Sequence, residues 1–261
     1  MTESPFPAAD LERIAKRFEM EVDLLTRTLD ACNAIAGRLD GRPLGGMSRE
    51  EFFVLFQFVK AFKSAQAIRL LFLNGYEEDA EMLLRVVAEQ AIIVRWVRHE
   101  DSDARTRAYA LHLKYNRLRI LAAAQPHVPD SGLAATLIEE IEREGAEYRA
   151  LPNSEKWLTM TRDVAAMAAD AGIPQSYAVH LNGTNLIHSN PIRERAYVRD
   201  RNDTTHFNAA AAIPDDGWTP VLTATHVLLI AQSVAELFQL GVAADLKRIG
   251  TELDGYQPRQ E

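Results

Sequence analysis

The feature that most constrains the fold of this chain is a pair of long apolar segments separated by a short turn. Ser48 followed by Glu51 matches a capping box, and the apolar run after it continues to about Leu73. Asn74–Gly75 can take the left-handed conformation that ends a helix, and a second apolar run follows. The pattern predicts a helical hairpin over about 48–98, with arms of roughly 33 Å.

The rest of the chain also shows helical rather than strand-like periodicity. Apolar residues recur at steps of three and four over about 8–37, which predicts an N-terminal helix. A chain of 261 residues is within reach of one domain. We therefore predict an all-α fold: a single-domain bundle of about seven to nine helices, spanning 1–261 around the hairpin. An irregular excursion is expected over about 190–217, where Arg, Asp, Asn and Thr are frequent.

Composition limits the compartment and the partners. No basic leader with a cleavage site is evident, and no stretch approaches the roughly 18 apolar residues of a membrane span. Cys32 is the only cysteine, so no intramolecular disulfide can form. We expect a cytoplasmic protein without a membrane partner. The net charge of −8 disfavours loose binding to nucleic acid, although basic residues are in local excess from Arg95 to Arg119.

Two charged residues stand out in the second arm of the hairpin. Arg85 and Glu89 are four residues apart within a largely apolar run, and a helix apolar on most sides normally lies in a core. Charges in a core need partners. The pair is therefore either an ion pair that fixes packing or part of a functional site.

A later helix, from Ser176 to about His188, carries polar residues on one face. Tyr177, His180, Thr184 and His188 lie within about 100° of one another on this helix. One interpretation is a half-polar helix whose histidines are hydrogen-bonded. The alternative is that Tyr177, Thr184 and His188 face Arg85 and Glu89 and form a pocket that can hold an anion. On that hypothesis the candidate catalytic residues are His188, Arg85 and Glu89, and the candidate ligand-binding residues include Tyr177, Thr184 and His180.

A second candidate site contains Arg107 and His112. Their Arg-x4-His spacing resembles the ribonuclease motif of the higher eukaryote and prokaryote nucleotide-binding domains, which are also all-helical. That resemblance implies that the arginine stabilises phosphate and the histidine handles the proton of the 2′-hydroxyl. Ala108 follows the arginine here, where that family usually has a polar residue.

Other classes of site have little support. His180, His188, His226 and Glu89 could converge on a metal, but their spacing matches no tight ligand motif. No nucleophile elbow or phosphate-binding loop is present, so we expect neither a metal nor a cofactor.

Several of these residues together carry a family resemblance. In order along the chain they are Ser64, Gly75–Tyr76 with Asp79–Ala80, Leu83 or Leu84 with Arg85 and Glu89, Trp157, Tyr177, and Thr184-x3-His188. Over roughly 50–190 the chain resembles the domain-of-unknown-function family 5677, which is mainly bacterial. Thr184 stands where that family usually has serine. The resemblance implies an all-helical fold and a grouping of Arg85, Glu89 and His188, but no activity.

Three functional hypotheses follow, and the sequence does not decide whether the protein is an enzyme. The first is a protein that binds a small anionic ligand or a protein partner through Arg85, Glu89, Tyr177 and His188. The second is a metal-independent ribonuclease of a toxin or phage-defence system. The third is a structural or interaction protein. RNA and a second copy of the chain both stay open as partners.

Overall fold

The computed structural model describes residues 7–124, 132–187, 198–201, 204–207, 212–214 and 216–257, and the all-α prediction is confirmed. The α-helices are α1 Ala8–Arg17, α2 Glu19–Leu39, α3 Arg49–Leu73, α4 Glu77–His99, α5 Ser102–Ala124, α6 Gly132–Ala150, α7 Trp157–Met160, α8 Val164–Asp170, α9 Ser176–Ile187, α11 Trp218–Leu237 and α12 Ala243–Asp254. Short 3-10 turns cover Leu44–Gly46 and Asn153–Glu155. The single-domain organisation stays a prediction.

The N-terminal segment is divided, whereas one helix was predicted over 8–37. Phe18 leaves helical geometry (φ −110°, ψ 28°) between α1 and α2. Its ring is buried and meets the ring of Phe72 edge-on, with the centroids 5.2 Å apart. The break keeps the apolar face of α1 on the core. A similar division between α7 and α8, together with α12, raises the number of described helices above the predicted seven to nine.

The start and end of α3 follow local chemistry. The Ser48 side chain accepts a hydrogen bond from the Glu51 backbone, and the Glu51 carboxylate accepts one from the Ser48 backbone. This reciprocal pair satisfies two backbone donors that the first turn leaves free. Gly75, with φ +76°, allows the sharp reversal into α4. Helices α3 and α4 then pack along each other.

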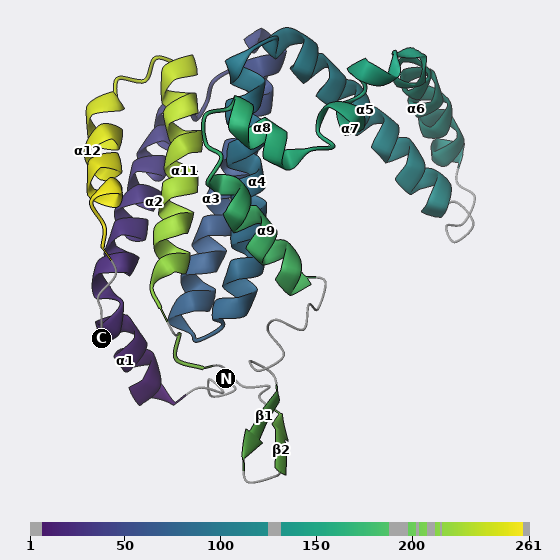
Figure 1. The fold of residues 1–261 in the computed structure, drawn as a ribbon. Helices are drawn as coiled ribbons and strands as arrows, with labels where there is room; N and C mark the ends of the chain where they lie inside the picture. The colour runs from purple at the N-terminus through teal and green to yellow at the C-terminus, as the bar shows by residue number, and fades with distance from the viewer. Residues whose placement is uncertain are drawn as a thin grey trace.

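The main body is built from α2, α3, α4 and α11, with α12 covering α2 and α11 (Figure 1). Helix α11 is buried along most of its length, against α2, α3 and α4. It is also long and apolar enough to cross a membrane, contrary to the sequence-based expectation. However, 67% of that window is buried within the protein, as in the core helix of a globular fold.

Helices α5 and α6 pack on each other and project away from the main body (Figure 1). The excursion predicted for about 190–217 lies partly outside the described residues. Its described part includes a two-stranded antiparallel hairpin, β1 Val198–Arg201 with β2 Thr204–Phe207, which the sequence analysis did not predict. Residues 212–214 reach the turn between α3 and α4, where the Ala212 backbone donates to the Gly75 carbonyl.

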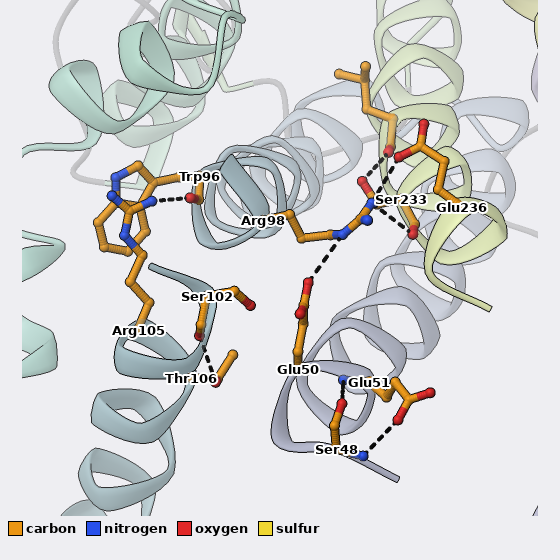
Figure 2. Close-up of polar contacts among 11 residues, drawn as sticks. Ser48, Glu50, Glu51, Trp96, Arg98, Ser102, Arg105, Thr106, Ser233 and Glu236 are labelled. Carbon is orange, nitrogen blue, oxygen red and sulfur yellow. Dashed lines mark hydrogen bonds and ion pairs between the residues drawn. The ribbon is translucent and has the colours of Figure 1, made fainter. Parts of the chain in front are cut away.

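Arg98 ties three helices together near the end of α4 (Figure 2). Its Nε lies 3.4 Å from Glu50 Oε1 of α3. On α11, its Nη1 donates to the Ser233 carbonyl at 3.0 Å and to the Glu236 carboxylate at 2.9 Å. Nearby, the Arg105 guanidinium stacks over the Trp96 ring, 3.9 Å from the centroid, and donates to the Trp96 carbonyl. These contacts fix α3, α4, α5 and α11 at one end of the body.

The buried imidazole of His226 makes stability depend on pH. His226 is a residue of α11 and is only 2% exposed. Burial lowers the pKa of its imidazole below 6.5. Below about pH 6.5 the unfolded chain therefore binds more protons than the native chain, so the free energy of unfolding falls as the pH decreases. We expect His226→Leu to reduce this slope by up to about 1.4 kcal/mol per pH unit, measured by urea unfolding between pH 7.5 and 5.

His99→Leu is the matched control for this experiment, because His99 is exposed at the end of α4. It should leave the slope unchanged. An unaltered slope in His226→Leu would contradict the prediction.

Candidate functional site

The candidate site lies where α9 crosses α4, and a glycine permits the approach. Gly183 is buried against α4, and a Cβ at this position would lie 2.5 Å from Arg85 Cβ and 3.0 Å from the Glu81 carbonyl oxygen. Only a residue without a side chain fits such a contact. The polar residues on either side of Gly183 are thereby brought against the polar face of α4.

Thr184 holds the guanidinium of Arg85. Its hydroxyl donates to the His180 carbonyl at 2.8 Å, one turn earlier in α9. The same oxygen accepts a hydrogen bond from Arg85 Nε at 2.8 Å. Because both roles of the hydroxyl are used, its oxygen is fixed in position and the plane of the guanidinium is restricted.

Glu89 lies between a guanidinium and an imidazole. Its Oε2 is 3.5 Å from His180 Nε2 and 3.8 Å from Arg85 Nη2. The His180 interaction lowers the pKa of Glu89, and the positive charges of Arg85 and Lys60 act in the same direction against the opposing effect of partial burial. Glu89 is therefore ionised at neutral pH.

The site is open to solvent to a limited degree. The Arg85 side chain is 26% exposed and that of Glu89 is 37% exposed, so the expectation of charges enclosed in a core was wrong. His180 is more deeply placed, at 9% exposure, and its Nδ1 is buried with no hydrogen-bond partner among the described residues. The arrangement thus combines a solvent-accessible cation with a buried imidazole.

Tyr177 and Asn182 extend the contact between the two helices. The Tyr177 ring is half-buried and stacks with the His180 ring at a centroid distance of 6.1 Å. The Asn182 amide donates to Glu81 Oε2 at 3.3 Å, a contact that the sequence analysis missed. The only sign of this contact in the sequence is that Glu78, Glu81 and Arg85 follow one another at steps of three and four residues. His188 lies outside the described residues, so its predicted place beside Arg85 stays a prediction.

The structure separates the two members of the Arg-x4-His pair. Arg107 is exposed, and its Nη2 lies 3.5 Å from Glu147 Oε1 of α6. His112 is buried, where its Nε2 is 2.7 Å from Asn116 Nδ2 and its ring lies against Tyr148. Burial, with a smaller contribution from the charge of Arg119, lowers the pKa of His112. Each residue therefore has its own neighbours between α5 and α6.

The part of the chain that the structure describes shows neither a metal centre nor a reactive thiol. Within the described ranges, no group of three or more His, Cys, Asp or Glu side chains could hold a metal ion. Cys32 is buried in α2, and burial raises the pKa of its thiol to about 12. The chemistry available at the site is consequently that of a guanidinium, a carboxylate, an imidazole and hydroxyl groups.

The fold and this cluster define an all-helical protein with a small, partly exposed polar site between two packed helices. Residues 51–205 match the family of unknown function DUF5677. Because the match covers more than half of the chain, the protein belongs to this family, as the sequence resemblance predicted. No curated protein and no solved structure shows significant similarity to the chain.

The close approach at Gly183 makes a direct prediction. In Gly183→Ala the new methyl group would overlap Arg85, and separating α9 from α4 should lower the free energy of unfolding by about 1–3 kcal/mol. Urea unfolding followed by circular dichroism measures this change.

Gly250→Ala is the control, because a Cβ there meets Leu228 at an ordinary 3.5 Å inside α12. That substitution should be neutral or stabilise the protein by about 0.4–1 kcal/mol. Equal effects of the two substitutions would show that Gly183 does not set the packing.

Proposed function

We propose that this protein binds a small anionic ligand at the contact between α4 and α9, through the guanidinium of Arg85. This proposal rests on which nitrogens of the Arg85 guanidinium are already hydrogen-bonded. Its Nε is bound by Thr184 at 2.8 Å, but the contact from Nη2 to Glu89, at 3.8 Å, exceeds hydrogen-bond distance. Among the described residues, neither Nη atom makes a hydrogen bond.

A guanidinium in this state suits a phosphate or carboxylate. The two Nη groups present planar donors that match two oxygens of such an anion, and pre-orientation by Thr184 reduces the entropy lost on binding. With 26% of the side chain exposed, a small ligand can reach it without unfolding the contact.

The local charge is compatible with an anion. Glu89 is negative, but Arg85 and Lys60 both lie near enough to lower its pKa. These three groups sum to one positive charge, which the carboxylate of Glu81 balances one turn away at the Asn182 contact. The His180 ring offers a further hydrogen-bonding group at the edge of the site.

A ribonuclease activity is the second candidate, and the Glu89–His180 pair is the observation that favours it. A carboxylate beside an imidazole is a common acid–base arrangement, and here a cation that could stabilise phosphate is adjacent. In this version of the hypothesis His180 joins His188 and His112 as a candidate for proton transfer.

Titration with inorganic phosphate and with AMP tests the leading proposal. Isothermal calorimetry on the whole chain should detect binding that Arg85→Gln weakens about tenfold or more, because charge-assisted hydrogen bonds are lost. Arg85→Lys should also weaken binding, since a lysine keeps the charge without the planar pair of donors.

Arg107→Gln is the matched control and should bind as the parent protein does. It lies at the other predicted phosphate position, so a loss in Arg107→Gln with Arg85→Gln unaffected would move the site to α5. If neither probe binds the folded parent protein, the cluster has only a role in holding α9 on α4.

Incubation with single-stranded and hairpin RNAs in the presence of EDTA separates binding from catalysis. The leading proposal expects the RNA to stay intact on denaturing gels. Cleavage that is lost in His180→Ala or His188→Ala would instead establish the enzyme at this site, and loss only in His112→Ala would place it on α5.

A further inference from the structure

A line of apolar side chains is uncovered along the outer face of α3. Its large hydrophobic members are Phe52, Phe56, Val59 and Leu70, which are 50%, 45%, 45% and 58% exposed. Steps of three and four residues place them in one row with Lys63 and Gln66, both also exposed. We call this row the α3 outer line. A scattered exposed hydrophobic residue is ordinary, but a row of this length marks an interaction site.

The α3 outer line continues into a hollow at the base of the projecting α5–α6 pair. The hollow has a volume of about 210 Å³, and Met47, Phe52, Phe53, Tyr109, Ala110 and Leu113 are among the residues that line it. Beyond it, Leu113 and Ile120 of α5 are 37% and 67% exposed. The apolar row of α3 and two exposed apolar residues of α5 therefore flank a recess, as in grooves that receive a helix.

The charges of this surface are basic except at the hollow, where Glu51 caps α3 and Asp103 pairs with Arg49. From Phe52 to Leu73 the only charged residues are Lys60, Lys63 and Arg69, in a chain whose net charge is −8. Helix α5 from Ala104 to Ala124 likewise carries arginines and lysines and no acid. An apolar row with basic surroundings complements a partner that presents apolar residues between acidic ones.

We propose that the α3 outer line and the adjoining hollow dock an acidic amphipathic helix of another protein. From Phe52 to Leu70 the row spans about 27 Å, which matches a partner helix of roughly 18 residues. Apolar side chains of the partner enter the hollow and lie along the phenylalanines, while its acidic flanks face Lys60 and Lys63.

A second copy of the chain fits less well as a symmetric partner, because the same face of the copy is also basic. Its clustered exposed hydrophobic residues are those of the same basic α3 and α5. The remaining ones in the described ranges, Met20, Leu158, Leu181 and Trp218, lie on other elements. Like charges brought together at an interface cost free energy, so charge disfavours a symmetric contact of two copies through this face.

Two designed peptides of 18 residues test the proposal. Both carry leucine at i, i+3, i+4 and i+7 positions, and the other positions hold glutamate in one peptide and lysine in its twin. The protein is labelled with an environment-sensitive dye through Gln66→Cys, because buried Cys32 should not react with the reagent. We expect saturable binding of the glutamate peptide, at least tenfold tighter than that of the lysine twin and weaker at high salt.

Variants locate the contact. Phe56→Glu should weaken binding of the glutamate peptide at least tenfold. The double variant Lys60→Glu/Lys63→Glu should bind the lysine peptide more tightly than the glutamate peptide. Leu158→Glu is the matched control, because Leu158 of α7 is 54% exposed and lies outside the α3 outer line. It should leave the affinity for both peptides unchanged. Circular dichroism and thermal unfolding verify that each variant is folded.

Other results would overturn the proposal. Equal binding of both peptides, or binding unaffected by Phe56→Glu in the folded protein, would exclude this surface as an acidic-helix site. Dimerisation in sedimentation that Phe56→Glu abolishes would assign the surface to a second copy. Binding of phosphatidylserine vesicles or RNA that Phe56→Glu abolishes, without binding of the glutamate peptide, would assign it to that ligand instead.

Discussion

The packing of α4 is the constraint on which the rest of the structure depends. This helix contacts α3, α5, α8, α9 and α11, so few of its faces can hold polar groups without partners. Arg98 meets this constraint by reaching between α3 and α11, where Glu50, Glu236 and the Ser233 carbonyl accept its donors. Arg85 meets it by lying at the crossing with α9. The polar site is therefore a product of the same packing that forms the body.

Local chemistry made the principal helices predictable from the sequence. The capping pair Ser48 and Glu51 and the glycine at position 75 determine where α3 begins and where the chain turns into α4, and all three signals are local. The break at Phe18 was not predictable, because the apolar spacing continues through it unchanged. It depends on a ring contact with Phe72, more than fifty residues away in the sequence.

The candidate site was predictable in its members but not in its connections. Helical spacing placed Tyr177, His180 and Thr184 on one face, and it placed Arg85 with Glu89. Which histidine approaches Glu89 depends on how far α9 slides along α4, and the contact at Gly183 sets that position. Likewise, the nearly uninterrupted apolar pattern of α3 does not reveal which face of the helix lacks a neighbour.

Lys60 belongs to the surroundings of both surfaces, which raises the question of whether they are coupled. It flanks the α3 outer line and also contributes to the lowered pKa of Glu89, although His180 and Arg85 contribute more. Its side chain is exposed, and interactions between exposed charges are screened over about 8 Å at physiological ionic strength. Pairing Lys60 with an acidic partner would thus change the electrostatic environment of Glu89 only slightly. The contact of Arg85 with Thr184 involves no residue of α3, so we expect a partner on the α3 outer line to leave this hydrogen bond in place.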